Sequence, residues 1–313
     1  EPGDVSSIGV GASGAGCALD AALRGLKVVL LEKEDFAAGT SSRSTKLIHG
    51  GVRYLEQAFK NLDLSQLRQV RHGLQERHTL LSNAPHLSRP LALVTPVFNW
   101  VAGLYYRTGL WLYDQIAARA DQLPSSRWLR RREALDLLPG LTERLHSAVL
   151  YYDGQLDDAR YCLALAQSAA EAGATVLNHA ETIEFLKNKE GKITGVSFRD
   201  LIENKNYNVN ARCVLNCAGP WADRLRQLAN PDLPQRIRPS KGVHIALPLS
   251  VLGGAETALL IPKTSDGRVV FAIPFSGKML VGTTDQDCPD LNREPRLEAA
   301  EIEYLLNTVR PYL

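Results

Sequence analysis

The chain has 313 residues, 45% of them hydrophobic and 22% charged, a balance that is ordinary for a globular protein large enough to form two domains. The formal net charge of +2 gives no general case for nucleic-acid binding, and no apolar run of about 20 residues predicts a membrane span. The five cysteines are widely spaced and form no C-x-x-C pair. We therefore expect neither a disulfide framework nor a zinc site, and a reducing compartment fits better.

Residues 4–35 read as a strand, a tight turn, a helix and a second strand. In this segment Gly9, Gly11 and Gly14 form the pattern G-x-G-x-x-G. The first glycine permits a sharp turn, the second lets the backbone approach a pyrophosphate, and the third allows the helix to pack closely on the strand. Because both strands and the helix flank the glycines, the segment predicts a dinucleotide-binding βαβ unit.

Glu32 ends the second predicted strand, at the distance from the glycines where a carboxylate can accept hydrogen bonds from the adenosine ribose. This spacing does not separate NAD from FAD, because both cofactors use the same fold. Ser6 and Ser7 stand where the first strand would take apolar residues. They weaken the strand prediction but not the prediction of a phosphate-binding turn.

The second predicted strand is followed by residues 39–57, GTSSRSTKLIHGGVRYLEQ. In a nicotinamide dehydrogenase, another helix usually follows this strand promptly. Small hydroxyl side chains and backbone N–H groups can line a pyrophosphate and a ribityl chain. Gly50 and Gly51 would let the backbone lie flat against a ring system. The stretch therefore favours FAD over NAD.

Seven segments together resemble the FAD-dependent glycerol-3-phosphate dehydrogenase family, the membrane-associated flavoprotein type. They occur in the family's order across nearly the whole chain: GVGASGAGCALDAALRGL, GTSSRSTKLIHGGVRYLEQ, APHL, YYDGQLDDAR, NCAGPWAD, KGVHI and GTTD. The resemblance implies an α/β fold in which a Rossmann-like FAD-binding domain is interleaved with a mainly antiparallel-sheet substrate domain. It also implies oxidation of sn-glycerol 3-phosphate to dihydroxyacetone phosphate, with hydride transfer to FAD N5 and a membrane quinone as electron acceptor.

The remaining pattern predicts an amphipathic helix over 60–82, an extended segment after residue 86, a helix, a strand and a hairpin around 189–191, and a hairpin within 267–285. The domain prediction has three parts. Residues 1–85 plus 155–228 form the FAD-binding domain, 86–154 plus 229–300 form the substrate domain, and 301–313 begin a C-terminal region that we expect to be truncated.

The predicted cofactor contacts combine the glycine turn, the acidic strand end, the hydroxyl-rich stretch and a later glycine turn. They are Gly9, Gly11, Ser13, Gly14, Glu32, Thr40, Ser41, Ser42, Lys46, Leu47, His49, Gly50, Gly51 and Gly219. Lys46 would place a positive charge near the isoalloxazine ring. No metal site is predicted.

Three residues are predicted to carry the chemistry: His244, Arg53 and Tyr54. An arginine fork matches phosphate oxygens, which makes Arg53 the candidate for the substrate phosphate, with Tyr54 as a further donor. His244 is the candidate base, because an unperturbed histidine pKa of about 6.5 suits proton transfer at neutral pH. His49 is the competing candidate, with cofactor contact as its favoured role.

Residues 101–116 hold four aromatic side chains among leucines, and four arginines follow within 127–132. They allow either an interfacial membrane patch or an aromatic helix packed in the substrate domain. The resemblance implies the cytoplasmic face of a bacterial inner membrane, or the mitochondrial inner membrane in a eukaryote. The chain opens without Met or an apolar signal core, and we expect any targeting segment to have been trimmed. In the family that this chain resembles, a glycine-arginine-proline motif and a glycine-glycine-lysine motif come after the segment that ends here at Leu313, so either the sequence is a fragment or the protein is shortened.

Several rival functions stay open at this point. An oxidase would use oxygen in place of quinone, and an amine oxidase of the same fold would bind a carboxylate in place of a phosphate. A non-catalytic flavin-binding protein is the rival from another class, and a nicotinamide dehydrogenase is disfavoured by residues 39–57.

Overall fold

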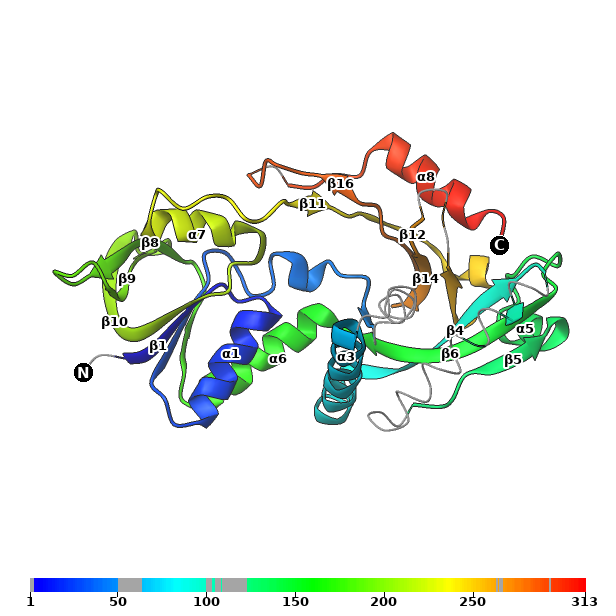
Figure 1. Ribbon diagram of the computed structural model, residues 1–313, viewed down its shortest axis with the longest axis horizontal. Helices are drawn as coiled ribbons and strands as arrows, with labels where there is room; N and C mark the ends of the chain where they lie inside the picture. Colours follow the sequence, from blue (N-terminus) through cyan, green and yellow to red (C-terminus); the bar gives the residue numbers. More distant parts are fainter. Residues whose placement is uncertain are drawn as a thin grey trace. The chain divides into compact units, whose positions relative to one another are not determined.

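The computed structural model of the protein describes residues 3–49, 64–99, 103–104, 108, 123–262, 264, 267–292 and 294–313. The chain forms two compact units, each assembled from segments that are distant in sequence (Figure 1). Unit 1 comprises Glu1–Ser44, Asp157–Pro239 and Asp287–Arg293. Unit 2 comprises Thr45–Leu156, Ser240–Gln286 and Glu294–Leu313.

Unit 1 is an α/β unit built on one sheet whose strand order is β7-β2-β1-β10-β9-β8. The strands β7, β2, β1 and β10 run parallel, and β10, β9 and β8 run antiparallel. Its elements are β1 (Gly3–Ile8), α1 (Ala12–Leu23), β2 (Val28–Leu31), η1 (Thr40–Ser42), α6 (Asp158–Glu171), β7 (Thr175–Leu177), β8 (Ala180–Lys187), β9 (Ile193–Asp200), β10 (Lys205–Asn216), η2 (Gly219–Trp221) and α7 (Ala222–Ala229).

Helices α1 and α6 lie side by side against the parallel part of this sheet (Figure 1). The contact is made by small residues, with Ala18 of α1 and Ala169 of α6 both fully buried. Alanines at the interface let two helices and a strand approach closely. On the ribbon of β8 and β9, Leu225 of α7 packs in the same cluster as Phe185 and Phe198. Helix α1 ends at Leu23, and Gly25 takes a left-handed φ of 79°, a conformation that favours glycine just after a helix.

Unit 2 contains a sheet with the strand order β12-β15-β14-β13-β4-β6-β3, and β5 also pairs with β6. All pairs are antiparallel except β13 with β4. Its elements are β3 (Leu47–Ile48), α3 (Leu64–Asn83), β4 (Ser88–Val97), β5 (Arg127–Arg130), α5 (Arg131–Leu137), β6 (Ser147–Leu156), β11 (Ser240–Lys241), β12 (His244–Pro248), η3 (Leu249–Leu252), β13 (Ala258–Ile261), β14 (Val270–Phe275), β15 (Lys278–Gly282) and α8 (Ala299–Val309); β16 (Gln286–Asp287) lies where the chain returns to unit 1.

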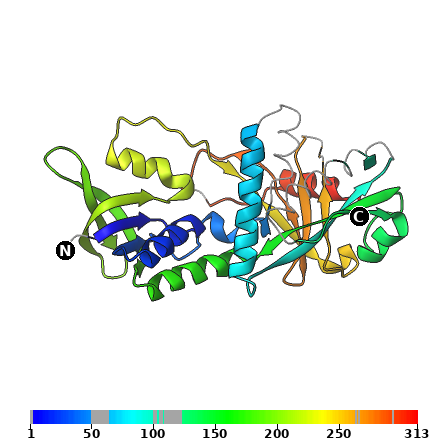
Figure 2. The same ribbon diagram turned by 60° about the horizontal axis from the view of Figure 1, so that its bottom comes forward.

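Both faces of the unit 2 sheet are buried. Along β13, Leu259 and Ile261 belong to one core cluster and Leu260 to another, which is the alternation expected of a strand. Leu305 and Val309 of α8 join the first cluster, and Figure 2 shows α8 beside the strands of this sheet. A Rossmann-like unit together with a mainly antiparallel sheet is the fold class that the sequence predicted, and that prediction is confirmed.

The units divide the chain differently from the predicted domain boundaries at residues 45–85. Strand β3 pairs with β6, and α3 packs on β4, so these residues belong with unit 2. The last described residues, 294–313, also belong to unit 2, where α8 packs. Which domain binds the cofactor and which binds the substrate stays a prediction.

A buried ion pair joins α8 to β11 within unit 2. Lys241 Nζ lies 2.9 Å from Glu301 Oε2, with side-chain exposures of 8% and 1%. Thr284 Oγ1 donates to Glu301 Oε1 at 2.9 Å, and its oxygen accepts from the Val243 N–H at 3.1 Å. Burial alone would raise the pKa of Glu301, but the hydrogen bond from Lys241 and those from the Glu298 N–H and Thr284 lower it. The same Glu301 raises the pKa of Lys241.

Replacing Lys241 with methionine is expected to destabilise the protein by about 3–5 kcal/mol, because a buried carboxylate loses its cation. The pair contributes fully above the ordinary glutamate pKa of 4.5 and below the ordinary lysine pKa of 10.5, and its contribution is lost outside this range. Urea denaturation at pH 7 measures the loss. Lys205→Met, which removes the exposed pair with Glu203, is the control and should change stability by less than about 1 kcal/mol. Equal effects of the two variants would contradict the expectation.

Candidate functional site

The tight turn between β1 and α1 is built from glycines that side chains would block. Gly9 has a left-handed φ of 99°, and a Cβ placed there would lie 2.6 Å from the carbonyl oxygen of Cys217. A Cβ on Gly14 would collide with the carbonyl oxygen of Gly9. The first turn of α1 therefore lies directly on the end of β1, and the backbone there is open to a ligand.

Helix α1 begins beside a hydroxyl from the stretch that the sequence singled out. Gly11 is the N-cap and supplies no side chain, and the Ala12 N–H donates instead to Ser41 Oγ at 2.9 Å. The N-terminus of a helix carries partial positive charge and unpaired N–H groups, which suit a phosphate. Thr40 and Ser42 lie with Ser41 in η1, where Ser42 Oγ donates to the Gly39 carbonyl at 3.3 Å.

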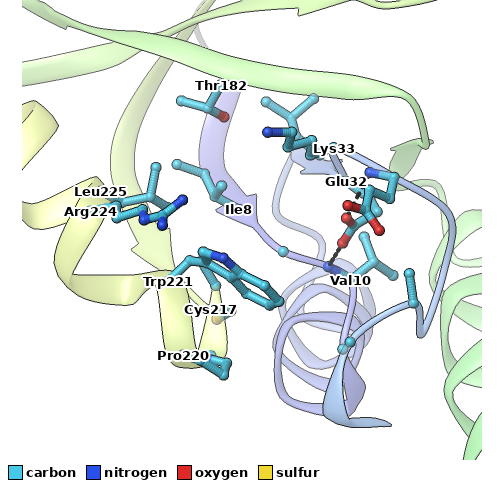
Figure 3. Close-up of a pocket in the computed structure, with 18 of the residues that line it drawn as sticks. Ile8, Val10, Glu32, Lys33, Thr182, Cys217, Pro220, Trp221, Arg224 and Leu225 are labelled. Carbon is cyan, nitrogen blue, oxygen red and sulfur yellow. Dashed lines mark hydrogen bonds between the residues drawn. The ribbon is translucent and has the colours of Figure 1, made fainter. Parts of the chain in front are cut away.

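Glu32 follows β2 and accepts two backbone hydrogen bonds. Its Oε2 accepts from the Val10 N–H at 2.7 Å, the bond drawn in Figure 3, and its Oε1 accepts from the Glu34 N–H at 2.9 Å. A carboxylate has about four acceptor positions, so two bonds leave capacity for ribose hydroxyls. Glu32 thus supports the turn itself, in addition to the ribose contact predicted for it.

The segment after β10 forms another wall of the pocket. Gly219 has a φ of 53°, and no atom lies within 4 Å of a Cβ placed on it. The side chains of Trp221 and Arg224 line the pocket from this segment, on a different side from Glu32 (Figure 3). Trp221 is 37% exposed, which leaves part of its ring open to a ligand.

The pocket lies wholly within unit 1 and has a volume of about 800 Å³, within the usual range for a cofactor or ligand site. Seven predicted cofactor contacts line it: Gly9, Gly11, Ser13, Glu32, Thr40, Ser41 and Gly219. Trp221, Arg224 and Thr182 also line it and were missed by the sequence analysis. The glycine turn GPW was the available signal for Trp221, whereas no local pattern marks Thr182.

Cys162 on α6 makes a hydrogen bond to the turn between β1 and α1. Its thiol donates to the Val10 carbonyl at 3.3 Å, and the side chain is fully buried. Burial raises the pKa of Cys162 to about 11. The residue is therefore a neutral hydrogen-bond donor at physiological pH, with no character of a reactive thiolate.

Gly14 and Ser42 lie in α1 and η1 of unit 1, and the remaining predicted site residues in the described part of the chain belong to unit 2. Lys46 has a φ of 60°, and its Nζ lies 5.7 Å from the centre of the Phe275 ring. Leu47 pairs with Gln155 across β3 and β6. His49 Nδ1 lies 2.7 Å from Asp153 Oδ2, and His244 Nε2 lies 3.0 Å from Thr45 Oγ1. Four predicted residues lie outside the described residues: Gly50, Gly51, Arg53 and Tyr54.

The membrane hypothesis rested on residues 101–116, most of which also lie outside the described residues. Of the arginines that follow, Arg131 is exposed and pairs with Glu143 at 3.1 Å. In the described part of the chain, no helix has the length and apolar composition needed to cross a bilayer. The same residues contain no cluster of His, Cys, Asp and Glu that could hold a metal ion.

Comparison with known proteins shows the family of the chain. The family model described as FAD dependent oxidoreductase matches residues 4–313. The chain belongs to the FAD-dependent oxidoreductase family. Within this family, it is 44% identical over 319 residues to the mitochondrial glycerol-3-phosphate dehydrogenase of Arabidopsis thaliana, covering 100% of this chain and 50% of the relative. It is also 44% identical to the mitochondrial glycerol-3-phosphate dehydrogenase of Homo sapiens, covering 99% of this chain and 43% of the relative.

Solved structures of FAD-dependent oxidoreductases have the same fold. The glycerol-3-phosphate dehydrogenase from Bacillus halodurans complexed with FAD matches with a TM-score of 0.77 and 31% identity, over 100% of this chain and 53% of that one. The L-alpha-glycerophosphate oxidase of Mycoplasma pneumoniae matches with a TM-score of 0.73 at 18% identity, over 100% and 79% of the two chains, which supports the fold alone. The resemblance predicted from sequence is confirmed. The chain spans about half the length of the curated relatives it matches.

Proposed function

We propose that this oxidoreductase binds FAD non-covalently and oxidises sn-glycerol 3-phosphate to dihydroxyacetone phosphate. The observation that carries the proposal is the tight glycine turn between β1 and α1 of unit 1, in a chain 44% identical to proteins named glycerol-3-phosphate dehydrogenase. The enzymes of that name are about twice as long as this chain, and we propose their activity for it.

The residues of unit 1 fit a dinucleotide. The clashes of a Cβ at Gly9 and Gly14 mean that only glycine allows the helix and the strand to meet at this angle. The Ser41 hydroxyl and the N-terminal N–H groups of α1 lie where a pyrophosphate would accept hydrogen bonds. Glu32 would accept from the adenosine ribose, and the apolar side chains Leu225 and Leu228 add to the pocket wall.

Bound FAD supplies the hydride acceptor, and the protein must orient the substrate and remove its hydroxyl proton. In the proposal His244 is the base, with its ring half-buried at the start of β12 and Nε2 beside Thr45 Oγ1. Arg53 and Tyr54 bind the substrate phosphate. Lys46, Leu47, His49, Gly50 and Gly51 contact the flavin, and Ser42 stays a predicted contact in η1.

We further propose a membrane quinone as the electron acceptor, with peripheral membrane contact, at the mitochondrial inner membrane or the cytoplasmic face of a bacterial inner membrane. The names of the relatives favour the mitochondrial location. The oxidase alternative has support from fold likeness only, at 18% identity, and so do the amine-oxidising alternatives, for which the glycine oxidase of Geobacillus kaustophilus is 21% identical.

An anaerobic absorbance spectrum of the purified protein, before and after adding glycerol 3-phosphate, tests the proposal. Bleaching of the visible flavin band supports FAD, the substrate and the half-reaction together. Glycine and L-proline at equal concentration are the controls and should leave the band unchanged. A flavin band bleached by either amino acid would favour an amine oxidase, whereas a band that no substrate bleaches would favour a flavin-binding protein without this activity. Reoxidation by a soluble quinone, compared with air, then separates dehydrogenase from oxidase.

A further inference from the structure

Three charged or titratable side chains form a line through the core of unit 2. Asp153 on β6 has no exposed surface, and its Oδ2 lies 2.7 Å from His49 Nδ1. Its other oxygen, Oδ1, accepts a hydrogen bond from Arg77 Nη1 on α3. Arg77 is only 1% exposed, whereas the His49 side chain is 34% exposed. The line therefore runs from a buried cation through a buried carboxylate to an imidazole that reaches the surface.

The fold brings these side chains together from three distant segments. Strand β3 pairs with β6 so that Ile48 lies opposite Gly154, which places the next residue, His49, beside Asp153. On α3, Val70 and Leu74 are fully buried, and Arg77 follows at the same helical spacing on that buried face. An arginine at a core position is costly unless it is paired, and Asp153 supplies the pairing charge.

Hydrogen-bonding capacity decides which tautomer His49 takes. An ionised carboxylate only accepts hydrogen bonds, and Arg77 already donates to the other oxygen of Asp153. The Nδ1 atom of His49 must then carry a hydrogen, so in the neutral ring Nε2 is the atom with the free lone pair. Phe271 contacts the ring edge-on, with centroids 5.8 Å apart at 77°, and restricts its rotation.

We propose that Asp153 and Arg77 are positioning residues that fix His49 as the Nδ1–H tautomer and so present Nε2 as a hydrogen-bond acceptor. The role of this tautomer in the reaction rests on the proposed function, in which His49 contacts the flavin. The tautomer itself is a property of unit 2 alone. An acceptor fixed in this way is oriented before any ligand arrives, which lowers the cost of binding or proton transfer there.

The variant Asp153→Asn provides a sharp test, because Arg77 has only donors. The amide oxygen of the asparagine must face Arg77, and its NH₂ group must then face His49 Nδ1. That nitrogen becomes an acceptor, and the ring is expected to switch to the Nε2–H tautomer. The substitution keeps the size of the side chain, and a second variant, Arg77→Lys, keeps the buried positive charge and should leave His49 as Nδ1–H.

Nitrogen-15 chemical shifts of histidine-labelled full chain distinguish the tautomers at a pH where the ring is neutral, and His49→Gln assigns the signal. His146, whose Nδ1 lies 3.0 Å from Ser147 Oγ, is the internal control and should not change in Asp153→Asn. An Nε2–H tautomer in the wild-type protein, or an unchanged signal in Asp153→Asn, would overturn the proposal.

A second measurement on the same samples tests whether the His49 tautomer matters for FAD reduction. FAD reduction by glycerol 3-phosphate is expected to slow by about 100-fold or more in Asp153→Asn. A tautomer switch with an unchanged rate would overturn the functional link. If glycerol 3-phosphate reduces no FAD even in the wild-type protein, the proposed function fails, while the chemical shifts still decide the tautomer.

Discussion

Replacing Gly14 with alanine is expected to weaken FAD binding by about 100-fold. The added Cβ would collide with the carbonyl oxygen of Gly9, and a backbone atom cannot rotate away as a side chain can. Forcing a methyl group into such a contact costs about 1–3 kcal/mol, and 1.4 kcal/mol corresponds to about tenfold in Kd. Helix α1 must move away from β1, so its N-terminal N–H groups leave the position where they would meet the pyrophosphate. Titration of the apoprotein with FAD, followed by flavin fluorescence, measures the change.

Gly16→Ala is the matched control, because Gly16 lies in the same helix two residues later and a Cβ there would meet no atom within 4 Å. It should leave FAD affinity unchanged and stabilise α1 by roughly 0.5–1 kcal/mol, since alanine replaces glycine inside a helix. If Gly14→Ala binds FAD as tightly as the control, the close contact of α1 with the turn is not needed for the cofactor.

The βαβ unit of unit 1 was predictable because its signals are local. The glycines, the alanine-rich helix and the apolar strand β2 all lie within residues 4–35, and each has one physical explanation. The pairing of β10 with β1 was not predictable in this way, because the two strands are about 200 residues apart. Only the resemblance to a family supplied that part of the fold.

The site was predicted well where the residue type itself is informative. Seven of the predicted cofactor contacts line one pocket, although their roles in binding remain predictions. Arg77 and Asp153 were missed for a physical reason. An arginine on an amphipathic helix reads as surface, and its partner lies 76 positions later in the chain. Buried charges are recognised only once the pairing is visible.

Strand β3 shows why the predicted domain boundary at residue 85 differs from the observed division. Only two residues of β3 pair with β6, too few to give a periodic pattern in the sequence. The pairing nevertheless starts unit 2 at Thr45. Residues 39–57, which the sequence suggested as one functional stretch, therefore contribute to both units.

Replacing His244 with asparagine is expected to slow the reduction of bound FAD by glycerol 3-phosphate by about 10²–10⁴-fold, the range for loss of a general base. FAD content should stay the same, because His244 does not line the dinucleotide pocket and is not among the residues proposed to contact FAD. Anaerobic stopped-flow absorbance at saturating substrate measures the rate of the half-reaction without any electron acceptor. The readout therefore does not depend on whether quinone or oxygen is used.

His146→Asn is the control for the substitution itself. His146 is an exposed histidine of the same unit, bonded to Ser147 and assigned no role in the reaction, so its variant should react within about twofold of wild type. His49→Asn decides between the two candidate bases. A rate lowered far more in His49→Asn than in His244→Asn would transfer the role of base to His49, whose Nδ1 is already occupied by a buried carboxylate. His244 would then have a structural role, because its hydrogen bond to Thr45 connects β12 to the first residue of unit 2.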